Sequence, residues 1–261
     1  MSPEKYFDLL RLSFLLPPGH LRKLKARDFL NMLRQNLPQA LPYSWLEIFY
    51  ETRLEVEEEI ERTFIETWDT VILSTGYPGF YWGSQAPFCD GMVRFTGGWP
   101  QHSYNALSPD LLELQFDQSQ IAREEPSLLP EIVCGFTAIA RNLEAFYAAG
   151  YVLRNYLLEN GAITFVIDVS ETLPSYSDWW DGIPKTPWLT WFGADYKSLL
   201  NDSLSGCELV TESTEDGCLL RLGEFPVYNA NAKKIYPRFP KEKHSSLALT
   251  HKLADMRSLS N

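Results

Sequence analysis

Hydrophobic positions near the start of the chain recur with two different spacings, which predict two kinds of element. Residues 9–16 form a mostly apolar run that Pro17, Pro18 and Gly19 end, a pattern typical of a buried strand closed by a turn. From residue 20 to residue 36 the apolar side chains recur at helical spacing, with basic residues between them, and Pro38 follows. The pattern predicts a strand and then an amphipathic helix with a basic outer face.

A second pair of elements follows between residues 45 and 69. Residues 45–50 are short, aromatic and alternating, which favours a strand. Val56, Ile60, Phe64 and Trp68 then recur at four-residue spacing, so they share one face of a helix. Most of the glutamates of this segment fall outside that stripe, and we expect them to coat the outer surface of the helix.

The rest of the chain predicts both helices and strands, with glycines and aromatic residues in the connecting loops. A long apolar segment without proline, residues 132–158, is interpreted as one or two core helices broken near Gly150. The Asp-Gly turn within residues 214–217 predicts a hairpin. We further expect strands at 71–74, 92–96, 111–116, 162–169, 208–211 and 218–222, and helices at 195–200 and 245–256. No repeat or long linker divides the chain, so the prediction is one α+β domain over residues 1–261, with antiparallel strands packed by helices.

The composition agrees with a folded protein of the cytoplasm. The chain has 261 residues, 45% of them hydrophobic, which is enough for a well-packed core. No apolar run approaches the roughly 20 residues of a spanning helix, and the first residues lack the basic and apolar regions of a signal peptide. The four cysteines form no CxxC pair, so free thiols are expected.

Negative charge is concentrated in one short segment. The net charge is −11, and residues 47–69 hold nine carboxylates against only Arg53 and Arg62. Such a surface suits a basic protein partner, and it argues against nucleic-acid binding, which requires clustered lysine and arginine. The candidate partner-binding residues here are Glu55, Glu57, Glu58, Glu59 and Glu61. The alternative is a solvated face whose acids interact favourably with the helix dipole.

Motifs for metal, nucleotide or nucleophilic chemistry are absent from the sequence. The four histidines lie far apart, with no HExxH and no His-Cys ligand spacing. There is also no GxSxG elbow, Walker loop or GxGxxG fingerprint. We therefore expect no cofactor and no metal.

The densest cluster of acids and aromatic residues comprises Asp178, Trp179, Trp180 and Asp181. Exposed tryptophans flanked by acids are common anchors in protein interfaces, which makes these four residues a second candidate partner-binding site. Two carboxylates beside indoles also suit a glycan-acting enzyme or a carbohydrate-binding protein. Glycan turnover that is lost in Asp178→Asn would support the enzyme, and glycan binding without turnover would support the binding protein.

The C-terminal third has an order of features that resembles a known class of proteins. It runs from Pro187-Trp188-Leu189-Thr190-Trp191-Phe192 through a short helix to the predicted hairpin, then to Phe225-Pro226 and a final Ser-Leu-Ala-Leu helix. This order resembles bacterial immunity proteins of polymorphic-toxin and type VI secretion systems, in particular the immunity protein 52 type.

The resemblance implies a non-enzymatic inhibitor that binds a cognate toxin inside the producing cell. Relatives of the immunity protein 52 type are associated with toxins that resemble restriction endonucleases. Because a nuclease needs a basic surface for phosphate, an acidic inhibitor would complement it electrostatically. The acidic segment after Glu51 then becomes the expected docking surface.

Overall fold

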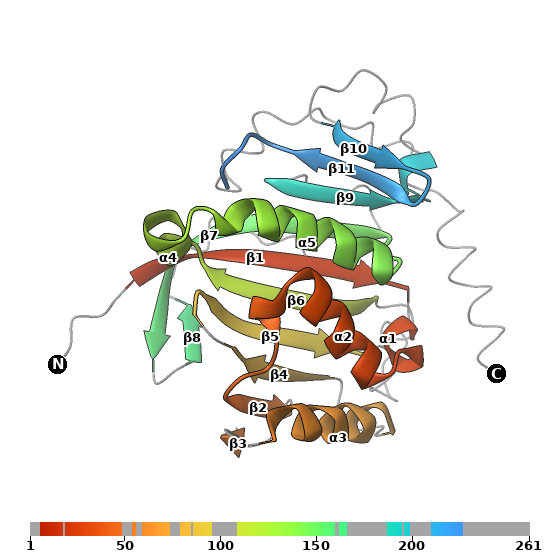
Figure 1. Cartoon of the computed structure of the whole chain (residues 1–261), viewed down its shortest axis with the longest axis vertical. Coiled ribbons are helices and arrows are strands. Elements are labelled where there is room, and N and C mark those ends of the chain that lie inside the picture. The colour runs from red at the N-terminus through yellow and green to blue at the C-terminus, as the bar shows by residue number, and fades with distance from the viewer. Residues whose placement is uncertain are drawn as a thin grey trace.

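Strand pairing joins the described strands into one continuous sheet in the computed structural model of the chain (Figure 1). The structure describes residues 6–17, 19–48, 54–55, 59–73, 79–84, 86–95, 109–159, 162–165, 187–194, 196–198 and 210–226. The strands in chain order are β1 (Tyr6–Leu16), β2 (Trp45–Ile48), β3 (Leu54–Glu55), β4 (Gly79–Gly83), β5 (Phe88–Arg94), β6 (Asp110–Asp117), β7 (Tyr147–Glu159), β8 (Ala162–Phe165), β9 (Leu189–Gly193), β10 (Val210–Thr214) and β11 (Gly217–Arg221). Across the sheet their order is β10-β11-β9-β7-β1-β6-β5-β4-β2-β3, with β8 paired to β7 beside this path.

Every strand pair among these residues is antiparallel. The helices are α1 (His20–Lys23), α2 (Ala26–Asn36), the 3-10 helix η1 (Pro38–Ala40), α3 (Ile60–Leu73), α4 (Gln118–Glu124) and α5 (Leu128–Asn142). In Figure 1, α2 and α5 lie in front of the sheet and α3 runs along β2. The predicted α+β class with an antiparallel sheet packed by helices is confirmed. None of the helices within the described ranges combines the length and the apolar character needed to cross a membrane.

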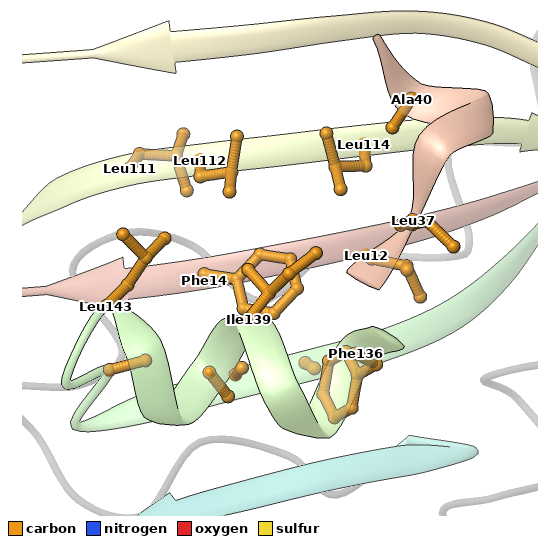
Figure 2. Close-up of a cluster of buried hydrophobic side chains, with 14 of the residues drawn as sticks. Leu12, Phe14, Leu37, Ala40, Leu111, Leu112, Leu114, Phe136, Ile139 and Leu143 are labelled. Atoms are coloured by element: carbon orange, nitrogen blue, oxygen red, sulfur yellow. The ribbon is translucent and has the colours of Figure 1, made fainter. Parts of the chain in front are cut away.

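Alternate residues of the strands form the core under the helices. Phe14 of β1 pairs with Leu112 of β6, which pairs in turn with Val93 of β5. Side chains of one cross-strand row lie on the same face of a sheet, so these three point together. Phe136 of α5 packs on Phe14 with ring centroids 5.2 Å apart, and Ile139 lies beside it (Figure 2). This row therefore defines the helix-covered face.

An aromatic cluster fills the space between α2, α3 and β4. Phe64 of α3 lies 5.2 Å from Phe80 and 5.5 Å from Trp82, both on β4, and Phe29 of α2 lies 6.0 Å from Trp82. All four side chains are fully buried, as is Trp68. The edge-to-face contacts and the large area removed from water make this cluster a major source of stability.

The predicted helix over residues 20–36 is divided into α1 and α2. Leu24 and Lys25 between them adopt extended backbone conformations. The interruption leaves the Leu24 carbonyl oxygen free of a helical hydrogen bond, and it accepts one from Trp68 Nε1 at 3.2 Å. A polar atom of the buried indole is thereby satisfied by the helix break.

Two of the sequence-based elements were wrong. Residues 71–73 are the last turn of α3 rather than part of a strand, because Val71 continues the buried stripe of Phe64 and Trp68. The segment 132–158 contains one helix, α5, which ends at Asn142, and then the strand β7. The break falls at Leu143 and Glu144, where Glu144 takes a φ of 50°, and Gly150 lies within β7.

The remaining element predictions are confirmed or lie outside the described residues. The hairpin is present as β10 and β11, and the strands expected at 9–16, 45–50, 92–96, 111–116 and 162–169 correspond to β1, β2, β5, β6 and β8. The helix predicted at 245–256 lies outside the described residues, as does part of the one at 195–200. The extent of the domain over residues 1–261 stays a prediction for the same reason.

Candidate functional site

Polar side chains gather on the face of the sheet that is turned away from the described helices. Ser13 of β1 pairs with Glu113 of β6, Glu113 with Met92 of β5, Met92 with Tyr81 of β4, and Tyr81 with Glu47 of β2. Each of these positions is one residue away from a row that faces the helices. Because side chains alternate along a strand, this row points to the opposite face.

A second polar row lies directly beside the first. Arg11 of β1 pairs with Tyr151 of β7 on one side and with Gln115 of β6 on the other, and Gln115 pairs with Asp90 of β5. The two rows together bring polar groups from six strands onto one face. We name this group the polar belt; it comprises Arg11, Ser13, Glu47, Tyr81, Asp90, Glu113, Gln115 and Tyr151.

Hydrogen bonds order the centre of the polar belt. Ser13 Oγ donates to Glu113 Oε1 at 2.8 Å and lies 2.9 Å from the Tyr151 hydroxyl. The serine hydroxyl has a single proton, which it donates in the hydrogen bond to the Glu113 carboxylate. The Tyr151 hydroxyl is therefore the donor in its hydrogen bond to the serine oxygen. Arg11 Nη2 donates to Gln115 Oε1 at 3.4 Å. The centre is therefore a directed chain from Tyr151 through Ser13 to Glu113.

Asp90 of the polar belt combines a buried carboxyl oxygen with partial exposure of the residue as a whole. Its Oδ1 atom is inaccessible to solvent and has no hydrogen-bond partner, although the residue as a whole stays partly exposed. Burial raises the pKa of Asp90 to about 7; the Arg11 guanidinium opposes the rise and the Glu113 carboxylate adds to it. A carboxyl group in this position changes charge near neutral pH, which is uncommon for aspartate outside functional sites.

Burial and nearby carboxylates also raise the pKa values of the two tyrosines of the polar belt. Burial, followed by the charge of Glu113, raises the pKa of Tyr151 to about 12. Burial also raises the pKa of Tyr81, and the carboxylates of Glu113, Asp90 and Glu47 add to this effect. Both phenols therefore stay protonated at neutral pH and can act as hydrogen-bond donors.

The acids predicted to bind a partner lie in a different place, around the start of α3. Glu55 lies on β3, Glu59 directly precedes α3, and Glu61 is in its first turn; all three are exposed. Glu66 and Asp69, further along α3, are exposed as well. Glu57 and Glu58 lie outside the described residues. The stripe of Phe64 and Trp68 is buried as predicted, so the exposed acids cover the outer side of this helix.

Several of these glutamates already have a basic neighbour. Arg62 contacts Glu59 at 2.9 Å and Glu66 at 3.3 Å within the α3 region, and Arg34 of α2 pairs with Glu61. Pairs this exposed contribute at most about 1 kcal/mol each. They fix the orientation of the carboxylates without removing the excess of negative charge on the helix.

The second predicted site cannot be placed relative to either surface. Asp178, Trp179, Trp180 and Asp181 all lie outside the described residues. Their assignment to a protein interface, or to a glycan site, stays a prediction.

The polar belt was not recognised from the sequence, although a signal was present. Residues 9–16 and 111–116 contain Arg11 and Ser13, and Glu113 and Gln115, at alternate positions among leucines and phenylalanines. Such alternation separates one face of a strand from the other. Asking which strands share a face would have placed these four residues together, but their pairing order comes only from the structure.

Metal ligation has no support within the described ranges, where no group of three or more His, Cys, Asp or Glu residues is arranged to hold an ion. The chemistry offered by the polar belt is instead that of paired carboxylates, phenols and a guanidinium. These groups can form charge-assisted hydrogen bonds to a polar or cationic group.

Comparison with known proteins finds a similarity of fold. No family model matches the chain, and no curated protein matches it in sequence. The chain is similar to the solved structure of a T6SS (type VI secretion system) protein of Pseudomonas aeruginosa, with a TM-score of 0.55 and 15% identity. The similarity covers 87% of this chain and 70% of that protein. At this level of identity it shows a shared fold.

Proposed function

We propose that this protein is an immunity protein that binds a type VI secretion toxin and neutralises it. The observation that carries the proposal is the fold shared with a T6SS protein over 87% of the chain. The order of features in the C-terminal third supports it independently, because it resembles the immunity protein 52 type. The protein acts by binding, without catalysis, in the cytoplasm of the cell that makes the toxin.

The charge distribution supports a toxin with a basic surface as the partner. The net charge is −11, and the exposed acids of the α3 region are presented on a helix whose other side is buried in the core. A nuclease presents such a basic surface where it binds phosphate. Complementary charge would speed the encounter and disfavour wrong partners.

Rescue of toxin-producing cells tests the proposal. Secreted nucleases encoded beside this gene would be expressed in a sensitive host, with and without this protein. We expect growth to be restored by this protein for one of these toxins and not for an unrelated toxin. The purified pair should form a complex of one-to-one stoichiometry, and failure to rescue from every neighbouring toxin would refute the proposal.

A further inference from the structure

The outer side of α2 and of the turn before it carries positive charge, although the protein as a whole is acidic. Lys23, Lys25 and Arg27 are exposed around the start of α2, and Arg34 is exposed near its end. The acid exposed among them is Asp28. None of Lys23, Lys25 and Arg27 forms an ion pair with a residue that the structure describes. These three charges are therefore available to a partner.

The acidic outer side of α3 lies directly beside these bases. Arg22, just before α2, donates to the Ile72 carbonyl oxygen in the last turn of α3. At the opposite ends of the two helices, Arg34 of α2 pairs with Glu61 of α3. The two helices are thus antiparallel neighbours, and a basic outer side adjoins an acidic one.

An apolar side chain is exposed where the start of α2 meets the end of α3. Leu73, the last residue of α3, is 84% exposed. Asp69, one turn earlier, is exposed and forms no ion pair within the described part of the chain, and Glu66 shares Arg62 with Glu59. We name this region the bipolar surface; it comprises Lys23, Lys25, Arg27, Glu66, Asp69 and Leu73.

A second copy of the chain matches this pattern through a two-fold axis. In a two-fold dimer the same surface of each copy faces the other. An axis that runs between α2 and α3, parallel to both, places the start of α2 of one copy over the end of α3 of the other. Bases then face acids in both halves of the contact. An axis that runs across the helices, in the plane of the contact, would place α2 over α2 and oppose like charges.

We infer that the bipolar surface joins two copies of this protein into a dimer around the axis parallel to α2 and α3. Leu73 of each copy packs on the aliphatic stems of the lysines of the other. Exposed charge pairs contribute little each, so the dimer is weak. The repulsion between two proteins of net charge −11 is screened beyond about 8 Å at physiological salt, whereas the contacts across the bipolar surface are shorter and are screened less.

The dimer is derived from this chain alone, and it goes beyond the proposed function. It covers the acids of α3 that are proposed to receive the toxin, so a second copy and the toxin exclude one another. The toxin complex keeps its one-to-one stoichiometry, and the dimer is the form that the protein adopts at high concentration without toxin.

Charge reversal on one side at a time tests the dimer. Lys25→Glu with Arg27→Glu makes the start of α2 acidic, and Glu66→Lys with Asp69→Lys makes the end of α3 basic. We expect each double variant to self-associate at least about tenfold more weakly than the wild type, because each opposes like charges in both halves of the contact. Analytical ultracentrifugation over a range of protein concentrations at physiological salt measures this affinity.

A mixture of the two double variants is the decisive measurement. It restores opposite charges in both halves of the contact, and the mixed dimer has the same total charge as the wild-type dimer. Its affinity should return to within about threefold of the wild type, since the two reversals compensate each other. General loss of stability or a change in overall charge would give no such recovery.

The matched control is Glu124→Lys with Glu125→Lys, which changes the net charge as the reversal on α3 does, on exposed residues at the end of α4. It should dimerise at least as well as the wild type. A wild type that stays monomeric up to roughly 1 mM would overturn the inference. A mixture of the two folded double variants that does not recover dimerisation would overturn it as well. Neither result bears on rescue from a toxin, so the proposed function is tested separately.

Discussion

Asp90 links the stability of the protein to pH in an unusual direction. Its pKa is raised to about 7 by burial, so between pH 4 and 7 the folded state holds a proton that the unfolded state has released. Stability should therefore fall as pH rises across this range and then stay constant. Asp90→Asn, which cannot ionise, should unfold like the wild type at pH 4 and be more stable by roughly 4 kcal/mol at pH 8.

Urea unfolding of both proteins across this pH range measures the difference directly. The difference between the two curves isolates Asp90 from the other ionisable groups that face it, namely Arg11, Glu47, Tyr81, Glu113 and Tyr151. Parallel stability profiles for the wild type and Asp90→Asn would contradict the assignment.

Gly91 is required because an indole lies against its backbone. A Cβ at this position would lie 2.1 Å from Cζ2 of Trp82, a side chain that is itself fully buried. We expect Gly91→Ala to lower the free energy of unfolding by about 3 kcal/mol, since the ring has no free space to move into.

Gly223→Ala is the matched control for Gly91→Ala. A Cβ there meets nothing within 4 Å, and only its φ of +73° opposes the change, at about 1 kcal/mol. If thermal unfolding shows the same loss of stability for Gly91→Ala and Gly223→Ala, the Trp82 indole is able to move aside.

At the scale of elements, α3 has a buried apolar side and an exposed acidic side, and the proposed function assigns toxin recognition to the acidic side. Phe64 and Trp68 face the core, while Glu59 and Glu61 face solvent, so the acids can be reversed without disturbing the packing. We expect Glu59→Lys with Glu61→Lys to slow toxin association about tenfold at low ionic strength, with the difference disappearing at high salt. Loss of the pair with Arg34 should cost less than about 1 kcal/mol of stability.

The control for this helix carries the same change in net charge elsewhere. Glu124→Lys with Glu125→Lys alters two exposed residues at the end of α4. The rate of toxin association would be measured for both double variants over a range of salt concentrations. This comparison distinguishes a local docking surface on α3 from the effect of the net charge of the whole protein. If the two variants slow association equally, the acids of α3 have no special role.

Some elements gave a clear signal in the sequence, whereas the buried strand β7 resembled a helix. The stripe on α3 and the Asp-Gly hairpin gave clear signals, and both are present. β7 is paired with β1 and β9, and its residues from Tyr147 to Leu153 are buried, so its apolar residues do not alternate and resemble a core helix. The α5 helix ends at Asn142, and the residue with positive φ that follows it is Glu144 rather than a glycine, so the usual stop signal is missing from the sequence.

For the candidate site the limit was pairing order rather than residue type. More than a hundred residues of sequence separate Arg11 from Glu113 and from Tyr151. The strand that holds Tyr151 was predicted to be a helix, so no local pattern joins the three residues. Only the order β7-β1-β6-β5 places them on adjacent strands. The acids of the α3 region, in contrast, are neighbours in sequence and were visible at once.

At the scale of the whole molecule, the sheet predicts a gradient of stability from its centre outward. β1 is paired on both sides, with β6 and β7, and is buried along most of its length, whereas β10 is the last strand of the described sheet. Backbone amides of β1 should therefore exchange with solvent only through global unfolding, and those of β10 through local opening. Hydrogen exchange followed by mass spectrometry measures both, and faster exchange in β1 than in β10 would contradict this order.

The central place of β1 also has a consequence for how the chain is made. Ser13 reaches its partners Glu113 and Tyr151 across 100 and 138 residues of sequence. At typical rates of protein synthesis the ribosome needs on the order of ten seconds to produce the strand that completes this contact. Until β6 has been made the first strand has neither neighbour, and its leucines and phenylalanines are open to nonspecific association. The nascent protein is thus a natural client for chaperones, and the polar belt stays incomplete until Tyr151, more than half-way along the chain, has been translated.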